Sequence, residues 1–314
     1  MWRKWWFRWG IGLAVTGLAL WLSFRQVDIG NLIQSISKVR WGWVGLAIFS
    51  QLAVIYLGGW RWQFLLSSKQ KISLARIFKL NILAQYANIV APARLGEAVR
   101  AVMVAKSDCV PMGFSFGTVV IERIFDLFIL ALLWLLFPLV ILVEHTAARI
   151  GTMAIGSLLL VVFLFMVAKK PELFWRFSRR LTWLVPHRFR EQFDEFVKSG
   201  LESFKLFARW REAALLLGFS ALFFVGQALS AYFMFFAFNL RLTFLAALVV
   251  LMMIKVGYMP PSAPGKVGIY EYAVVIALGI FSVNKDAALS YALLLHVTSF
   301  LPKILLGQYF VVKK

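Results

Sequence analysis

The chain has 314 residues, of which 61% are hydrophobic and only 15% are charged, and its mean hydropathy is +0.80. This composition excludes a soluble globular domain and predicts an all-α, polytopic membrane protein, because the apolar runs are continuous rather than alternating. The formal net charge of +20 comes mostly from Lys and Arg between apolar runs, which is typical of loops that face anionic lipid. We therefore expect membrane lipids as partners and no nucleic acid, and the sequence leaves protein partners unknown.

Six apolar runs are long enough to be full spans: 9–24, 43–66, 114–140, 150–168, 213–239 and 287–310. The first run is short, but flanking Trp residues can anchor it in the interface. It follows a basic start and has no small-residue cleavage site, so we expect it to remain as a span and not to be removed as a signal peptide.

Two further apolar stretches, 77–105 and 242–280, are interrupted near their middle by Pro and Gly. The second half of each stretch covers only about ten residues, or roughly 15 Å of helix, which cannot cross a bilayer alone. We predict that both are re-entrant hairpins of two half-helices. Broken backbone at membrane depth needs protein or a water-filled cavity to satisfy its N–H and C=O groups, so each break is a candidate binding site.

The distribution of Lys and Arg predicts a multi-pass protein of the cytoplasmic (inner) membrane with both termini in the cytoplasm. In that orientation about 23 of the 34 basic residues fall in inside segments, as the positive-inside rule requires. The first hairpin then enters from the cytoplasm and the second from outside. Residues 77–140 and 242–310, each a hairpin followed by a full span, are candidate inverted repeat units of a single membrane domain, 1–314. Residues 169–211 are predicted to be a basic, amphipathic cytoplasmic segment.

The first hairpin carries ionisable residues at its break. Arg94 precedes Gly96, which we expect to allow a tight turn, and Glu97 and Arg100 lie on one face of the following half-helix. A half-helix N-terminus and planar guanidinium groups both suit phosphate, so we predict an anion site here. Glu97 could orient the arginines, carry a proton or cap the half-helix. The alternative is an ion-pair network that only supports the fold.

Three more ionisable residues, Glu122, Arg123 and Asp126, lie inside the span after the first hairpin and should face the protein interior. Arg123 and Asp126 are three residues apart, so they can pair within the helix, or Arg123 can form a wall of the phosphate site. Arg61 and Lys303 lie near span ends, and we expect their side chains to reach lipid headgroups.

The second hairpin repeats the combination of glycine, base and carboxylate. Gly265 and Gly268 provide backbone freedom, Lys266 is the base, and Glu271 opens the following half-helix. Glu271 alone could be only a favourable carboxylate in the first helical turn. Its match to the position of Glu97 in the first hairpin favours a role in binding.

Motifs for metals, cofactors and catalysis do not occur in the sequence. Cys109 is the single cysteine, and His145, His187 and His296 lack the spacing of metal ligands. No P-loop, dinucleotide fingerprint, nucleophile elbow or zinc-protease motif is present. We therefore predict no cofactor and favour a role that is not enzymatic.

In their order along the chain, these motifs resemble the lysylphosphatidylglycerol synthase transmembrane-region family, also called flippase-like or YbhN-like membrane proteins. The resemblance rests on Pro92-x-Arg94-x-Gly96-Glu97-x-x-Arg100, Glu122-Arg123-x-x-Asp126, Pro264-Gly265-x-x-Gly268-x-x-Glu271 and Leu301-Pro302-x-x-Leu305-x-Gly307. The family pattern usually has Pro-Gly-Gly where this chain has Lys266 as the third residue, which adds a positive charge to the predicted site. The resemblance implies lipid handling, since relatives translocate lysylphosphatidylglycerol or are linked to cardiolipin, hopanoid or polyprenyl-phosphate glycolipid pathways.

We therefore predict a lipid transporter or flippase that moves an anionic or phosphate-linked lipid between leaflets. Its headgroup would enter a polar cavity between the hairpins and meet Arg94, Arg100 and Arg123, while the tails stay in the bilayer. Such a path avoids the large desolvation penalty of a charged headgroup in hydrocarbon. In the bifunctional synthases a soluble transferase domain follows the membrane region, whereas this chain ends at Lys314, so we do not expect aminoacyl transfer here.

Two alternatives stay open. One is a membrane-embedded transferase that acts on a polyprenyl-phosphate or phospholipid donor, with Glu97, Glu122, Asp126 and Glu271 as acid–base groups. The other is a membrane scaffold that transports nothing, in which neutralising the hairpin charges would preserve function.

Overall fold

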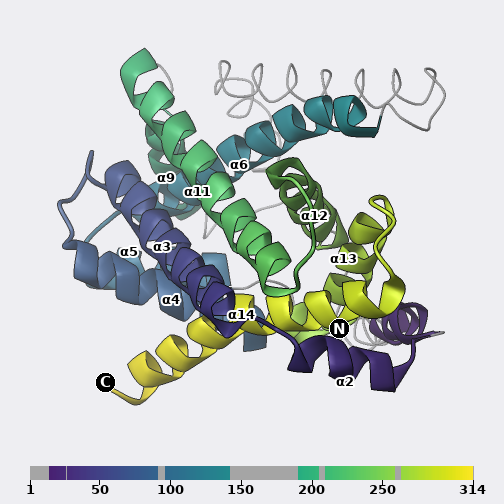
Figure 1. The fold of residues 1–314 in the computed structure, drawn as a ribbon. Coiled ribbons are helices and arrows are strands. Elements are labelled where there is room, and N and C mark those ends of the chain that lie inside the picture. Colours follow the sequence, from purple (N-terminus) through teal and green to yellow (C-terminus); the bar gives the residue numbers. More distant parts are fainter. Residues whose placement is uncertain are drawn as a thin grey trace. The chain divides into compact units, whose positions relative to one another are not determined.

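The computed structural model describes residues 14–25, 27–90, 96–141, 190–204, 209–258 and 263–313, and for 136–141 only the helical backbone. Every regular element in these ranges is helical (Figure 1). Three of the described helices are long and apolar enough to cross a membrane: α3 (Trp41–Leu66), α11 (Trp210–Ala237) and α14 (Lys285–Val312). These helices confirm the all-α class and a polytopic membrane protein.

Most predicted spans coincide with helices to within a few residues. The predicted runs 43–66, 213–239 and 287–310 correspond to α3, α11 and α14, and 114–140 corresponds to α6 (Met112–Ile141). The helix Ala14–Phe24 covers the described part of the first predicted span. The predicted span 150–168 lies outside the described residues.

Both predicted hairpins contain two helices, one on each side of the predicted break, and residues 91–95 and 259–262 between them lie outside the described residues. The first contains α4 (Leu74–Val90) and α5 (Gly96–Ser107), and the second contains α12 (Phe244–Gly257) and α13 (Ile269–Gly279). A 3₁₀ turn, η4 (Pro264–Lys266), precedes α13. A short link then leads to a long helix in each case, α6 or α14, so the same order of elements occurs twice. Re-entry into the membrane and the inverted relation of the two repeats stay predictions.

The chain forms two compact units. Unit 1 comprises residues 1–55, 82–96 and 225–314, and unit 2 comprises 56–81 and 97–224. The boundaries fall inside α3, α4 and α11, so each of these helices contributes residues to both units.

The core of unit 2 consists of apolar side chains from α3, α4, α5, α6 and α11, among them Trp62, Leu65, Ile77, Val104, Phe114, Ile121 and Leu216. The helix α9 (Arg190–Ser203) packs on the start of α6. A Cβ atom at Gly113 would lie 1.9 Å from the Phe196 carbonyl oxygen, so glycine is what allows this close approach. Of the predicted segment 169–211, residues 190–203 thus form a helix packed on α6 and 210–211 begin α11, whereas 169–189 and 205–208 lie outside the described residues.

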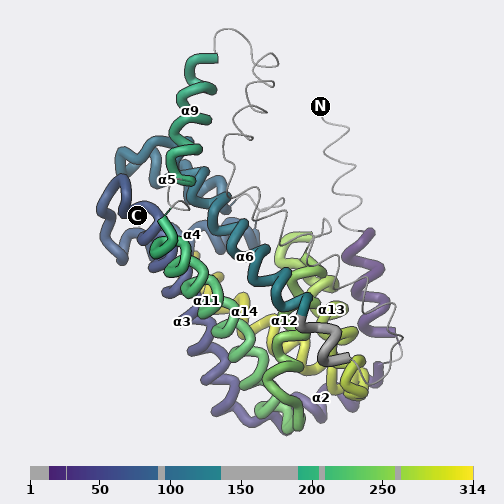
Figure 2. Tube along the Cα trace, turned by 90° about the horizontal axis from the view of Figure 1, so that it is seen from above, coloured from purple at the N-terminus to yellow at the C-terminus, as the bar shows by residue number. Residues whose placement is uncertain are grey.

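Unit 1 is organised around α14. Within this unit α13 packs against both α12 and α14, and α2 (Ile29–Ser37) packs on α14 (Figure 2). Tyr291 of α14 is fully buried, and its hydroxyl donates to the Ala231 carbonyl of α11 at 2.7 Å. At the start of α14, Asn31 of α2 donates its amide to Asp286 at 3.1 Å. These contacts fix the helix that carries His296.

Candidate functional site

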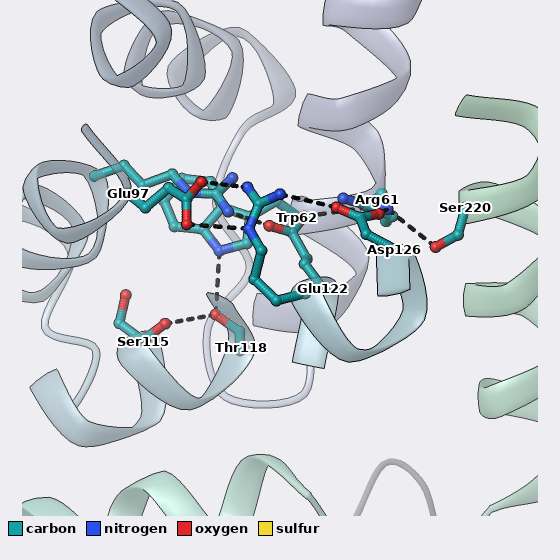
Figure 3. Close-up of polar contacts among 10 residues, drawn as sticks. Arg61, Trp62, Glu97, Ser115, Thr118, Glu122, Asp126 and Ser220 are labelled. Carbon is teal, nitrogen blue, oxygen red and sulfur yellow. Dashed lines mark hydrogen bonds and ion pairs between the residues drawn. The ribbon is translucent and has the colours of Figure 1, made fainter. Parts of the chain in front are cut away.

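Three arginines and three carboxylates of unit 2 form one connected ion-pair network (Figure 3). We call it the charged network; its members are Arg61 of α3, Glu97 and Arg100 of α5, and Glu122, Arg123 and Asp126 of α6. Acids and bases alternate along it, so that every contact joins opposite charges. Its formal charges cancel, as expected for ionised groups placed in an apolar chain.

One end of the charged network is buried. The Glu122 side chain is 1% exposed; its Oε1 accepts from Arg61 Nε at 3.3 Å and its Oε2 accepts from Arg100 Nη2. Arg61 Nη1 also donates to Asp126 Oδ1 at 2.6 Å and to the Ser220 hydroxyl at 3.0 Å. These bonds join α3, α5, α6 and α11 within unit 2, and removing one partner of such a buried pair costs about 3–5 kcal/mol because the other charge is left unpaired.

The other end is accessible. The Arg123 side chain is 48% exposed and that of Glu97 is 29% exposed. Arg123 binds Glu97 through two parallel contacts, Nε–Oε2 at 3.0 Å and Nη2–Oε1 at 2.5 Å. Its Nη1 donates to Asp126 Oδ2 at 3.0 Å, which confirms the predicted pairing within the helix. A rigid guanidinium thus lies at the exposed end of a buried network.

Aromatic rings and hydroxyls surround the buried end. The Arg100 guanidinium lies 4.6 Å from the centroid of Trp62, and that of Arg61 lies 5.0 Å from the centroid of Phe223. Trp62 Nε1 donates to the Thr118 hydroxyl at 3.1 Å. These contacts replace part of the hydration that the arginines lose on burial.

The prediction for Arg61 is wrong. It does not reach headgroups: only 4% of the residue is exposed, and its guanidinium binds Glu122 and Asp126. The physical reason is charge balance, because these two carboxylates face one side of α6 and Arg123 alone cannot neutralise both. The need for further cations was visible in the sequence, but which arginine supplies them depends on how α3 packs on α6.

The predicted anion site of the first hairpin is only partly described. Arg94 lies outside the described residues. Glu97 and Arg100, predicted on one face of a half-helix, belong to opposite ends of the charged network, where Glu97 binds Arg123 and Arg100 binds Glu122. Within the described residues, Arg123 is therefore the arginine of this network that a ligand can reach.

Gly96 was expected to allow a tight turn, but in the structure it is the first residue of the helix α5. A Cβ atom at Gly96 would lie 1.8 Å from the Ala84 carbonyl oxygen, so glycine allows α5 to start directly against α4. Its N–H donates to Asn88 Oδ1 at 2.8 Å. One of the amides that was predicted to meet an anion is thus satisfied by the protein itself.

A second buried polar site lies in unit 1. Glu271 Oε2 accepts from the Gly268 N–H at 2.6 Å, and its Oε1 lies 2.6 Å from His296 Nδ1. His296 Nε2 lies 3.0 Å from the Gly265 carbonyl oxygen, and its ring stacks on Tyr270 with centroids 4.3 Å apart. Glu271 is therefore both a first-turn cap of α13 and the partner of a histidine that sequence reasoning missed.

The loop before α13 has left-handed backbone at three positions: φ is 70° at Gly265, 59° at Lys266 and 85° at Gly268. The predicted backbone freedom at the two glycines is confirmed. Lys266 adopts the same region without being glycine, and its Nζ lies 4.3 Å from the Tyr258 ring centroid and 3.5 Å from the Tyr258 carbonyl oxygen. A cation at the C-terminal end of α12 is favourable, which gives a physical reason for lysine where the family pattern has glycine.

Comparison with known proteins assigns a family. The family described as "Lysylphosphatidylglycerol synthase TM region" matches residues 9–307. A UPF0104 membrane protein of Methanothermobacter thermautotrophicus is 22% identical over 95% of this chain and 90% of its own length. Another, of Pyrococcus horikoshii, is 26% identical over 96% of this chain and 95% of its own length. The glycosyltransferase AglD of Haloferax volcanii is 32% identical over 38% of this chain, which is 19% of that protein.

Proposed function

The chain belongs to the lysylphosphatidylglycerol synthase transmembrane-region family, and we propose that it moves an anionic or phosphate-linked lipid between the leaflets of the cytoplasmic membrane. The accessible end of the charged network carries this proposal. Arg123 is held by carboxylates on two sides, yet almost half of its side chain is exposed. Such a fixed, reachable guanidinium is suited to a phosphate group.

Glu97 occupies the place on Arg123 that a phosphate would take. Its two oxygens bind Nε and Nη2 in the parallel geometry that guanidinium also offers to phosphate. A lipid phosphate that displaces Glu97 would take over its bidentate contact, and the released Glu97 carboxylate, already 29% exposed, would turn to solvent. Asp126 would keep its bond to Nη1 and hold the guanidinium in place during the exchange.

The buried arginines have a supporting role in this proposal. Arg61 and Arg100 are each only 5% exposed at the side chain and are bound by carboxylates, so we assign them to holding α6 and not to headgroup contact. Four other residues remain proposed site residues: Arg94 of the first hairpin, and Gly265, Lys266 and Gly268 of the second.

A transferase acting on a lipid-phosphate donor is the second candidate function. The likeness of part of the chain to a glycosyltransferase favours it. Against it, three of the four predicted acid–base groups, Glu97, Glu122 and Asp126, are bound by arginines. A carboxylate held by guanidinium groups is better placed to fix charge than to exchange protons with a substrate.

Mass spectrometry of the lipids that copurify with the protein in mild detergent tests the proposal. We would compare wild type with Arg123→Gln and with Arg209→Gln. Arg209 is a matched control, because it forms a pair with Glu212 at 3.0 Å and i,i+3 spacing, as Arg123 does with Asp126, but at an exposed surface.

We expect one anionic lipid class to be enriched in wild type and Arg209→Gln and reduced about tenfold in Arg123→Gln, since a charge-assisted contact to phosphate is lost. A lipid profile equal to that of the bulk membrane in all three proteins would refute the binding site and favour a scaffold. Turnover of a polyprenyl-phosphate sugar by the purified chain would favour the transferase.

A further inference from the structure

The contacts of Glu271 and His296 define how many protons the two side chains hold together. The Gly265 carbonyl oxygen can only accept, so His296 Nε2, 3.0 Å away, carries a proton and donates. Gly268 N–H donates to Glu271 Oε2, which leaves Oε1 facing His296 Nδ1 at 2.6 Å. A proton must lie between these two atoms, on one or the other, because two lone pairs at this distance repel each other. The pair therefore shares one proton and is electrically neutral.

We propose that Glu271 and His296 form a proton-binding site that clamps the second broken hairpin, and that its shared proton is coupled to lipid movement. The coupling rests on the proposed function, whereas the proton site does not depend on lipid. Both residues are buried, and together they join α14, the first turn of α13 and the loop at Gly265. Gain or loss of one proton at this point can therefore change three elements at once.

Loss of the shared proton removes one side of the clamp. The proton passes to water, Glu271 is left as a carboxylate, and His296 is left as a neutral ring with a single N–H. That N–H can donate to Glu271 or to Gly265, but not to both. Either α13 or the loop is then released from α14, and rebinding of a proton restores both contacts.

Several elements pack around the pair and contribute ionisable groups. Tyr270 of α13 stacks on the imidazole, and Phe300 of α14 contacts it edge-on, with centroids 4.3 Å apart. The same elements carry further ionisable side chains: Lys255 of α12 and its C-cap Tyr258, Lys266 of the loop, Tyr272 of α13, and Lys285, Asp286, Tyr291, Lys303 and Tyr309 of α14. The helix Ala14–Phe24, whose Thr16 hydroxyl accepts from the Ala263 N–H at 3.1 Å, has no ionisable side chain. The other carboxylate, Asp286, lies in the first turn of α14 and binds Asn31, whereas Glu271 contacts the imidazole of His296, so the shared proton belongs to this pair.

Two substitutions separate the clamped and released states. In Glu271→Gln the amide oxygen can accept from Gly268 and the NH₂ can donate to His296 Nδ1, so the clamp persists without a removable proton. His296→Ala removes both ring contacts and releases the clamp. Asp28→Asn is the matched control, because it makes the same change from carboxylate to amide at an exposed position of the same unit, where an amide oxygen can still cap α2.

Hydrogen exchange measured by mass spectrometry on the segment 263–271 reports the clamp. Exchange is followed from acidic to alkaline pH in lipid nanodiscs and corrected for intrinsic rates with an unstructured peptide. We expect protection in wild type and Asp28→Asn to fall about tenfold as pH rises, because a bond to a charged group is lost. Glu271→Gln should stay protected and His296→Ala should be unprotected throughout. Protection that does not change with pH in wild type, or that changes equally in Glu271→Gln, would overturn the proton site.

Proteoliposomes with and without a pH gradient test the coupling, with fluorescent phosphatidylglycerol as the probe. We expect the gradient to change the rate of lipid movement several-fold in wild type and to have no effect in Glu271→Gln or His296→Ala. Equal wild-type rates with and without the gradient would refute the coupling. If no probe moves in any liposome, the proposed function fails, and hydrogen exchange alone decides the proton site.

Discussion

Replacing Glu122 by glutamine perturbs the charged network at its most buried member. The wild-type carboxylate accepts from Arg61 Nε at 3.3 Å through one oxygen and from Arg100 Nη2 through the other. In Glu122→Gln one of these oxygens becomes an NH₂ group, which is a donor that faces a guanidinium donor. The formal charge of the network also changes from zero to +1, and the extra positive charge arises at its buried end, where the side chains of Arg61 and Arg100 are each 5% exposed.

The expected loss of stability is about 3–5 kcal/mol, the usual cost of removing one partner from a buried ion pair. A matched change at the surface should cost far less. Glu202 forms a pair with Lys69 at 2.6 Å, but these side chains are 42% and 39% exposed. Because exposed ion pairs contribute roughly 0–1 kcal/mol, Glu202→Gln should be nearly neutral.

Reversible unfolding in mixed detergent micelles, followed by tryptophan fluorescence, compares the free energies of unfolding of the two variants with that of wild type. The double substitution Arg100→Met with Glu122→Gln should lose less than the sum of the single losses, because it removes the cation that the first change leaves unpaired. A loss for Glu122→Gln as small as that for Glu202→Gln would refute the reasoning, since the charged network would then not hold unit 2 together.

Two further substitutions test the geometry of the breaks by the same unfolding measurement. Gly96→Ala should cost at least about 1–3 kcal/mol, because its Cβ atom would lie 1.8 Å from the Ala84 carbonyl oxygen. Gly279→Ala, which has no atom within 4 Å of the added Cβ, should be neutral or slightly stabilising, and equal losses at both sites would contradict the close approach. Lys266→Gly relieves a left-handed backbone worth roughly 1–2 kcal/mol but loses about 0.3–1 kcal/mol of charge stabilisation at the end of α12, so it should be neutral or slightly stabilising. Lys266→Ala keeps the left-handed backbone strain and also loses the charge, so it should be less stable than Lys266→Gly. If Lys266→Ala were the more stable of the two, this account would be contradicted.

The helical class and most helix bounds could be predicted because hydrocarbon thickness dictates them. The run 114–140 corresponds to α6, Met112–Ile141, since an apolar segment must cover the membrane core and ends where polar residues begin. The break before α13 was equally visible, because Pro264, Gly265 and Gly268 cannot continue a regular helix.

The partners of the ionisable residues could not be predicted in the same way. Local spacing correctly paired Arg123 with Asp126, but the bond from Arg61 to Glu122 joins residues 61 positions apart. Such a bond depends on how α3 packs on α6, which no local pattern encodes. His296 lies 25 positions after Glu271, and its only signal in the sequence was a histidine inside an apolar helix.

The most direct test of the central claim is lipid movement in proteoliposomes that contain fluorescent phosphatidylglycerol or phosphatidylcholine. We predict that wild type and Arg209→Gln move phosphatidylglycerol faster than phosphatidylcholine, and that Arg123→Gln loses about tenfold of this preference because the exposed guanidinium is gone. Movement of both lipids at the rate of protein-free vesicles, or an unchanged preference in Arg123→Gln, would contradict the claim that Arg123 receives an anionic headgroup.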